Sequence, residues 1–221
     1  MIKNLVFDLD GTLLDTIEEI TKALNETLID FSLPEITVAE GKSFLGHGTE
    51  HLLRHALKGA ILDQETYQSF KDAYMKRQIV YQLEATRPFP GVLALINDLI
   101  NRGMRLFVYS NKPHPFAVKL IEARFPGAFE AVIGQQPGHA PKPNVAPFLP
   151  ILEKYGVDPQ TSVYVGDSLV DIKTAAALGM RAAAVTWGYV PRERLLEAQP
   201  AFIIDRPGQL LQAVINEESQ P

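Results

Sequence analysis

Two aspartates follow the first apolar segment of the chain, with a single leucine between them. Residues 5–7 have the composition of a buried strand, and Asp8, Leu9, Asp10 and a glycine come directly after them. Two carboxylates this close repel each other unless a cation neutralises them or one of them is protonated. The pair therefore indicates either a bound cation or a carboxyl group that is held protonated.

Polar residues also follow two later apolar segments. Ser110 and Asn111 end the segment RLFVYSN, and Asp167 follows SVYVG, with Asp171 four residues further on. In a doubly wound sheet, ligands bind in the crevice beyond the carboxyl ends of the strands. A single aspartate there often only caps a helix, but several together are more than a cap needs. We therefore expect these side chains and the first pair to form one site.

The residue types at this site indicate the ligand. Oxygen ligands without sulfur or a nearby histidine favour a hard cation, with Mg²⁺ as the first choice. Lys142 stands between two prolines ahead of a predicted helix. Alone it would be an exposed loop residue. Beside several carboxylates it can hold a phosphate oxygen and balance the charge of an aspartate nucleophile.

The composition excludes several other classes of protein. The chain has 221 residues, of which 46% are hydrophobic and 21% charged, as in soluble globular proteins. Its formal net charge is −5 and its basic residues are scattered, so we expect no nucleic-acid partner. The chain has no cysteine, which excludes disulfides, zinc–thiolate sites and thiol nucleophiles. We find no signal peptide and no apolar run near ~18 residues, so we expect a cytoplasmic location and no membrane partner.

The spacing of apolar residues changes along the chain. Between 16 and 86 only helical patterns occur, over 16–31, 50–57 and 64–81. Beyond that point, helices of about ten residues alternate with short apolar strands. The predicted strands are 5–7, 105–110, 131–134, 162–167, 181–185 and 201–205, and the predicted helices among them are 92–102, 116–124, 146–155 and 170–178.

This order of elements predicts an α/β fold. Alternating strands and helices form a parallel sheet with helices on both faces. We therefore predict a doubly wound, Rossmann-like core domain formed by 1–15 and 87–221. The all-helical stretch 16–86 interrupts the alternation after its first strand, and we interpret it as an inserted helical cap domain.

Four ordered motifs resemble those of the haloacid dehalogenase superfamily. They are DLDGTLLDT, SNKP, Lys142 and GDSLVD, and the matched core covers 1–15 and about 87–215. The insertion after the first motif resembles that family's small helical cap. Within the superfamily, GHGTEHLLRHAL, YSNKP and TWGYV resemble segments of the phosphoglycolate phosphatases.

The resemblance implies a role for each core residue. Asp8 would be the nucleophile that accepts the phosphoryl group. Asp10 would protonate the leaving alcohol and then activate the water that hydrolyses the aspartyl phosphate. Ser110 and Lys142 would bind the phosphoryl oxygens, and Asn111 would belong to the same substrate site.

The resemblance also implies a metal site. Mg²⁺ would bind the Asp8 carboxylate, the Asp10 main-chain carbonyl and Asp167, while Asp171 would orient Lys142 or a metal-bound water. A phosphate monoester repels an anionic nucleophile, so this reaction needs positioning and positive charge. Because a halide leaves without a proton, the presence of Asp10 favours phosphoryl transfer over dehalogenation.

The cap is expected to determine specificity by closing over the core. Gly46, His47 and Gly48 predict a tight loop that reaches into the cleft, with His47 at its tip. Arg54 on the following helix is a candidate partner for a substrate carboxylate.

Other basic residues near these segments have no assigned role. His51 and His55 are four residues apart, but the H-E-x-x-H pattern is absent, so we predict no zinc site. Lys112 and His114 follow the predicted strand 105–110, and their positions alone indicate no function.

The predicted function is a Mg²⁺-dependent phosphatase that hydrolyses a small phosphate monoester through an aspartyl phosphate. The substrate would be 2-phosphoglycolate or a similar small metabolite. A sugar-phosphate phosphatase, a phosphomutase or a pyrophosphatase would use the same core. The alternative from another class is a non-catalytic phosphoacceptor or metal-binding scaffold. The expected partner is a small phosphorylated metabolite, and the expected state is a monomer or homodimer.

Overall fold

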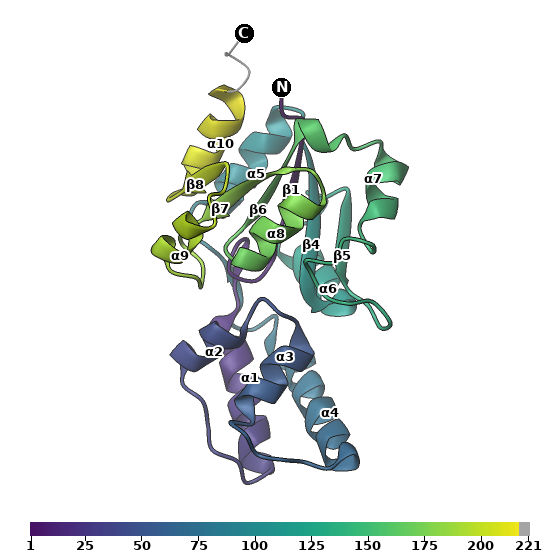
Figure 1. Ribbon diagram of the computed structural model, residues 1–221, viewed down its shortest axis with the longest axis vertical. Helices are drawn as coiled ribbons and strands as arrows, with labels where there is room; N and C mark the ends of the chain where they lie inside the picture. Colours follow the sequence, from purple (N-terminus) through teal and green to yellow (C-terminus); the bar gives the residue numbers. More distant parts are fainter. Residues whose placement is uncertain (217–221) are drawn as a thin grey trace.

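The computed structural model describes residues 1–216 as two adjoining units. One is a six-stranded sheet flanked by helices, and the other is a group of four helices below the sheet in Figure 1. All strand pairs in this sheet are parallel, in the order β5-β4-β1-β6-β7-β8, which confirms the predicted doubly wound α/β class. The strands are β1 (Asn4–Phe7), β4 (Arg105–Pro113), β5 (Ala131–Gln135), β6 (Ser162–Gly166), β7 (Arg181–Val185) and β8 (Phe202–Ile204).

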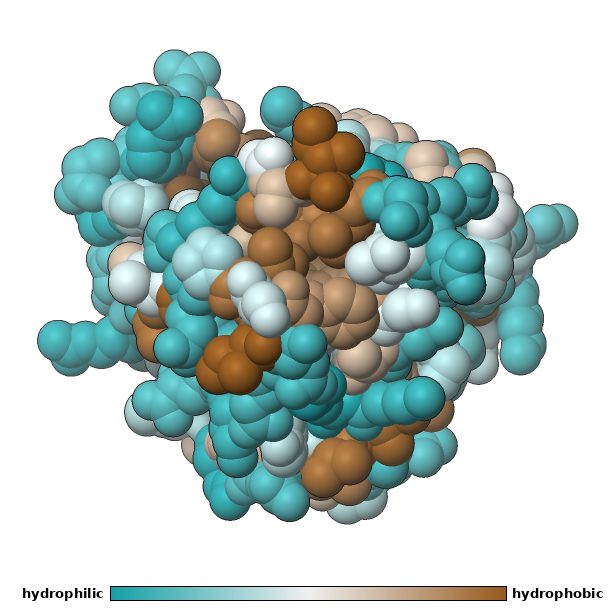
Figure 2. All heavy atoms as spheres, turned by 90° about the horizontal axis from the view of Figure 1, so that it is seen from below, coloured by the Kyte–Doolittle hydropathy of each residue, from teal (hydrophilic) through white to brown (hydrophobic). Residues whose placement is uncertain are grey.

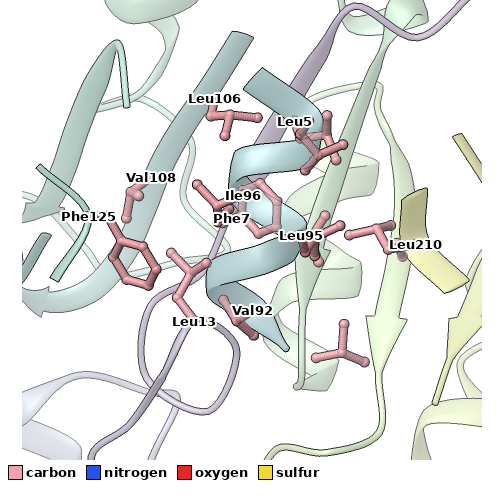
Figure 3. Packing of buried hydrophobic residues seen from close by; sticks show 14 of the residues in the cluster. Leu5, Phe7, Leu13, Val92, Leu95, Ile96, Leu106, Val108, Phe125 and Leu210 are labelled. Carbon is pink, nitrogen blue, oxygen red and sulfur yellow. The ribbon is translucent and has the colours of Figure 1, made fainter. Parts of the chain in front are cut away.

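The central strands are buried on both faces. Their consecutive side chains point alternately to the two faces of the sheet, and the side chains on both faces are apolar. Leu5 and Phe7 of β1 lie in one hydrophobic cluster, and Val6 lies in the cluster on the opposite face. Figure 3 shows Leu95 and Ile96 of a helix packed beside Leu5 and Phe7. The helices with buried residues in the first cluster are α5 (Val92–Asn101), α6 (His114–Arg124) and α10 (Pro207–Asn216), and those packed on the second are α7 (Leu149–Tyr155) and α8 (Leu169–Ala177).

The helical unit has a hydrophobic cluster of its own. Leu24 and Leu28 from its first helix meet Leu53 and Phe70 from later helices, and all four side chains are fully buried. The unit lies beyond the carboxyl ends of the strands in Figure 1. Its helices are α1 (Ile17–Asp30), α2 (Val38–Phe44), α3 (Thr49–Ala56) and α4 (Gln64–Tyr81).

The chain enters and leaves the helical unit through a short antiparallel ribbon. Strand β2 (Leu14–Asp15) pairs with β3 (Arg87–Pro88), so the two crossings lie side by side. The main-chain N–H of Thr16 donates to the hydroxyl of Tyr189, which follows β7. The helical unit is therefore joined to the sheet through two adjacent segments.

Several elements differ from the sequence-based expectation. Helix α2, the short helix α9 (Arg192–Glu197) and α10 were not predicted, although Thr37 and Glu40 form a capping box at the start of α2. Helix α7 begins at 149 and not at 146, because the preceding residues form turns in which Phe148 N–H donates to the Val145 carbonyl at 2.8 Å.

Figure 2 shows the molecule from below, on the side of the helical unit away from the sheet. Hydrophobic atoms gather near the middle of this view, inside a hydrophilic border. The exposed apolar residues of the helical unit include Ile29 and Ile61, which are 56% and 96% exposed. Along residues 1–216, no helix combines the length and the apolar character needed to cross a lipid bilayer.

Candidate active site

Asp8 lies at the carboxyl end of β1, where it is buried and held by two donors. The main-chain N–H of Leu9 donates to its Oδ1 at 2.7 Å, and Lys142 Nζ lies 2.9 Å from the same oxygen. Burial, reinforced by the nearby charge of Asp171, raises the pKa of Asp8 to about 7, although Lys142 acts in the opposite direction. A further positive charge beside Asp8 would favour its ionised form.

Lys142 is buried, and four neighbouring residues hold it. Its Nζ lies 2.7 Å from Asp171 Oδ1 and 3.0 Å from the Tyr164 hydroxyl, besides its contact with Asp8. Its main-chain N–H donates to Asn111 Oδ1 at 2.7 Å. Burial acts to lower the pKa of Lys142, but the carboxylates of Asp171 and Asp8 outweigh it and raise that pKa well above its ordinary value. The side chain is thus a fixed positive charge.

Asp171 caps a helix as well as holding this lysine. Its Oδ2 accepts from the main-chain N–H of Ser168 at 3.0 Å and from the Ser168 hydroxyl at 2.5 Å. Ser168 Oγ in turn accepts from the Asp171 N–H, which completes a capping box at the start of α8. The two oxygens of Asp171 therefore have different tasks, one toward the helix and one toward Lys142.

Asp167 follows β6 and is buried. Its Oδ1 accepts from the Thr12 hydroxyl at 3.2 Å, and its Oδ2 accepts from the Tyr189 N–H at 2.7 Å. Gly11 lies against it with φ of +83°, and a Cβ there would approach Asp167 Oδ2 to 2.5 Å, so only glycine fits this turn. Burial and the charges of Asp171 and Asp8 raise the pKa of Asp167 well above its ordinary value.

The site carries an excess of negative charge that a cation would balance. Within residues 1–216, oxygens of Asp8, Asp167 and Asp171 lie within 4.8 Å of one another, and all three residues are buried. Asp10 and the buried Glu19 add two more carboxyl groups beside Lys112, so five carboxyl groups lie near the two buried lysines Lys112 and Lys142. A divalent cation would offset most of this excess, and an all-oxygen donor set suits Mg²⁺. The residues present therefore fit the expected metal.

The carboxyl end of β4 supplies the next part of the site. The strand continues to 113, beyond its expected end at 110, and so includes Ser110, Asn111 and Lys112. Ser110 Oγ accepts from the Lys112 N–H at 3.2 Å, and Asn111 Nδ2 donates to the Gly46 carbonyl at 2.8 Å. Asn111 therefore connects the sheet to the loop of the helical unit and to Lys142.

Several of these residues line a cavity between the sheet and the helical unit. The cavity encloses about 710 Å³, including its opening to solvent. Asp8, Asp10, Ser110 and Asp167 lie at its base. The helical unit contributes Lys42, Gly46 and Gly48, the polar Gln78, and the mainly apolar Ile20, Leu45, Leu52, Tyr74 and Met75. Gln78 is buried, and its Nε2, itself inaccessible to solvent, has no hydrogen-bond partner within residues 1–216.

Two of the expected cap residues lie elsewhere. The Arg54 side chain is 64% exposed, pairs with Glu50 at 2.8 Å and lies over the Tyr67 ring, and it does not line the cavity. The expectation that Arg54 faces the substrate is therefore not met, because its helix turns that side chain to the surface. His47 is exposed at the loop tip, whereas its neighbours Gly46 and Gly48 line the cavity.

Three other histidines make structural contacts. His51 and His55 stack with ring centroids 3.8 Å apart, and their Nδ1 atoms lie 3.1 Å and 2.8 Å from the main-chain carbonyls of Phe44 and His51. His114 Nδ1 accepts from the Gly134 N–H at 3.2 Å, which joins α6 to β5.

Sequence patterns did not identify Lys42, Gln78 or Glu19 as part of this region. Lys42 lies on the unpredicted helix α2, and Gln78 lies on a face of α4 that has no distinctive motif. Only their position in the folded protein distinguishes them from surface residues. For Lys42, the Thr37–Glu40 capping box was the available signal, since it marks the start of the helix.

The fold and the acidic site together define a class of hydrolase. A family model described as haloacid dehalogenase-like hydrolase matches residues 5–185. The chain therefore belongs to this family, as its four motifs predicted.

Known relatives place the chain within the family. It is 31% identical to phosphoglycolate phosphatase 1 of Pseudomonas aeruginosa, over 93% of this chain and 77% of the relative. It is 31% identical to the phosphoglycolate phosphatase of Aquifex aeolicus, over 96% of both chains. Together with the family match, these similarities confirm the predicted enzyme class, a phosphoric monoester hydrolase.

Solved structures agree with this placement. A protein of Lactobacillus delbrueckii subsp. bulgaricus, provisionally assigned as a phosphoglycolate phosphatase, shares 30% identity and a TM-score of 0.89, with 96% of this chain and 98% of that chain covered. A predicted phosphoglycolate phosphatase of Haemophilus somnus shares 26% identity and a TM-score of 0.88, with coverages of 96% and 97%.

Proposed function

We propose that the protein is a Mg²⁺-dependent phosphatase that hydrolyses a small phosphate monoester, 2-phosphoglycolate or a similar metabolite, through an aspartyl phosphate on Asp8. The observation that carries this proposal is the buried group of Asp8, Asp167 and Asp171 around Lys142, of which Asp8 and Asp167 line a cavity. The names of the relatives support the choice of substrate.

In the first step, the free carboxylate oxygen of Asp8 attacks phosphorus. The Leu9 N–H and Lys142 both bind Oδ1 and so orient the carboxylate with Oδ2 available for attack. The bond from phosphorus to the leaving oxygen breaks as the new bond forms, and Asp10 donates a proton to that oxygen. Lys142 and Ser110 stabilise the charge on the phosphoryl oxygens.

In the second step, Asp10 removes a proton from a water molecule as that water attacks the phosphorus. The bond to Asp8 breaks, which releases phosphate and restores the Asp8 carboxylate. Division into two steps replaces one difficult hydrolysis by two easier displacements.

A bound Mg²⁺ would be held by the carboxylates of Asp8 and Asp167 and the main-chain carbonyl of Asp10. It would supply positive charge that offsets the repulsion between the phosphate dianion and the Asp8 carboxylate. Asp171 would keep Lys142 in position through the ion pair between Asp171 Oδ1 and Lys142 Nζ, which are 2.7 Å apart.

Metal removal tests the proposal directly. We expect excess EDTA to lower phosphate release from a panel of monoesters by on the order of 10²–10³-fold or more, and Mg²⁺ to restore it, because a preorganised charge beside the phosphoryl group is lost. The panel contains 2-phosphoglycolate, sugar phosphates, a nucleotide and pyrophosphate. Undiminished release in EDTA would contradict the metal requirement, and a stable phosphoprotein without turnover would indicate a phosphoacceptor.

The helical unit, residues 16–86, would act as the cap domain that selects the leaving group. Lys42 and Lys112 are the cations that line the described cavity. Lys112 is paired with carboxylates, whereas Lys42 is exposed and forms no ion pair within residues 1–216, with its Nζ 5.8 Å from the centre of the Tyr189 ring. A glycolate leaving group carries a carboxylate that needs such a partner once water is excluded. We therefore assign carboxylate recognition to Lys42.

Replacing Lys42 with alanine should lower kcat/KM for 2-phosphoglycolate by about 10-fold, because a carboxylate partner is lost. Hydrolysis of p-nitrophenyl phosphate should change by less than about 2-fold, since that leaving group has no carboxylate. Arg54→Ala is the matched control, because Arg54 is a cation of the same unit outside the cavity, and it should leave both substrates unaffected. Equal losses on both substrates in Lys42→Ala would contradict the assignment.

The partner would thus be a small phosphorylated metabolite. We propose no nucleic-acid or membrane partner, a cytoplasmic location, and a monomer or homodimer.

A further inference from the structure

We propose that Lys112 is a positioning residue that holds Asp10 in place, and that Glu19 of the helical unit holds Lys112 in turn. Proton transfer to the leaving group would then depend on how the helical unit is attached to the sheet. The inference rests on the proposed phosphatase chemistry, in which Asp10 moves that proton.

Lys112 binds Asp10 from within the protein. Its side chain is 3% exposed, and its Nζ lies 3.1 Å from Asp10 Oδ1. Its main chain is also held in place. Its N–H donates to Ser110 Oγ, and its carbonyl oxygen packs so closely against Gly134 that a Cβ on Gly134 would lie 2.5 Å from it. A buried ammonium group on a rigid strand restricts Asp10, which lies in a loop and is 16% exposed, to one orientation.

Glu19 approaches Lys112 from the other side. It lies in the first turn of α1, its side chain is fully buried, and its Oε1 lies 3.7 Å from Lys112 Nζ. This Oε1 has no hydrogen-bond partner within residues 1–216, so Lys112 is the charge that compensates it. A buried carboxylate without a cation nearby would be costly.

The network spans both connections to the helical unit. Glu19 follows the outgoing connection, and its Oε2 accepts a hydrogen bond from Thr86, which directly precedes β3 on the returning connection. A change in how the helical unit is attached to the sheet would therefore alter the position of Asp10 through Glu19 and Lys112.

Leaving groups of different basicity test this role. An alkoxide needs a proton to leave, whereas p-nitrophenolate does not. We expect Lys112→Met to lower kcat/KM for 2-phosphoglycolate and for an alkyl phosphate with an uncharged leaving alcohol by on the order of 10²-fold. The loss for p-nitrophenyl phosphate should stay below about 3-fold. Lys112→Arg should recover part of the activity on both alkyl esters, and Glu19→Gln should cause a smaller loss with the same selectivity.

The comparison excludes other roles for Lys112. Equal losses on alkyl and aryl esters would indicate a structural role and overturn the inference. A loss confined to 2-phosphoglycolate would mean that Lys112 binds the substrate carboxylate, which would also overturn it. Lys22→Met is the control for one lost charge, since Lys22 is an exposed lysine on α1 beside the Tyr81 ring, and it should change neither rate.

A double-mutant cycle tests the link to Asp10. In an Asp10→Asn background, Lys112→Met should lower kcat/KM for the alkyl ester by less than about 3-fold, because the group that it positions no longer transfers a proton. Fully additive losses would overturn the inference. If Lys112→Met alone does not fold, Lys112→Met with Glu19→Gln removes both buried charges and should show the same selectivity.

The unaltered enzyme separates the two proposals. If it releases phosphate from no ester of the panel, the proposed function fails, and this inference fails with it. If it turns over alkyl and aryl esters, equal losses in the Lys112 variants overturn this inference alone.

Discussion

Replacing Asp8 with asparagine should lower turnover by on the order of 10⁶-fold, the scale expected when a covalent nucleophile is lost. The amide cannot form the acyl phosphate, although Leu9 N–H and Lys142 can still bind its oxygen. Acid quenching during turnover of substrate labelled in its phosphoryl group should trap label on the unaltered enzyme and none on the variant. Peptide mapping should locate the label at Asp8.

Comparison of Asp10→Asn with Asp8→Asn separates the proton-transfer role from the nucleophilic role. It should also be slow, because both proton transfers are lost. It should retain Mg²⁺ affinity, because the proposed ligand is the main-chain carbonyl of Asp10, which the substitution leaves unchanged. Label trapped on any residue other than Asp8 would show that the proposed nucleophile is wrong.

Replacing Lys142 with methionine should lower kcat by on the order of 10²–10³-fold, the cost of losing one preorganised charge at the phosphoryl group. The same change should lower the free energy of unfolding by about 3 kcal/mol in EDTA, because one partner of a buried ion pair is removed. Lys142 Nζ lies 2.9 Å from the Asp8 carboxylate and 2.7 Å from the Asp171 carboxylate. Without this shared cation, the two buried carboxylates repel each other. Urea denaturation measures the second effect.

Two comparisons separate catalysis from stability in this variant. Saturating Mg²⁺ should recover part of the lost stability, since it neutralises the same carboxylates, but should not restore kcat. Combining Lys142→Met with Asp171→Asn should also recover stability, because it removes one uncompensated charge. A Lys142→Met enzyme with undiminished kcat would contradict the role of Lys142 in phosphoryl transfer.

The sheet was predictable because its signals are local. Leu5, Val6 and Phe7 can all be apolar only in a strand covered on both faces, and the structure places Val6 opposite the other two. Parallel strands end at a common edge, so polar residues directly after them had to converge. The sequence therefore predicts that Asp8 and Asp167 share one site, and their oxygens lie within 4.8 Å of each other.

The helical unit was less predictable. Its pattern of apolar residues indicates that helices are present, but it does not determine which polar side chains point toward the sheet. Arg54 and Lys42 are both cations in this unit, yet the first pairs with Glu50 at the surface and the second lines the cavity. The difference arises from how α2 and α3 are rotated as they pack, which depends on contacts between segments far apart in the sequence.

The alternation of short apolar strands and helices was enough to predict the fold class. The four ordered motifs were enough to predict the family and the acidic site, because each needs only a few consecutive residues and three of them lie at the ends of strands, with Lys142 in the loop after β5. The tertiary structure was needed to link Lys112 to Glu19, which are 93 residues apart in sequence and 3.7 Å apart at Nζ and Oε1. It was also needed to show that Lys112 is buried beside Asp10. Whether a charged side chain is solvated or desolvated depends on everything packed around it, and its energetic role follows from that environment and not from its own position in the sequence.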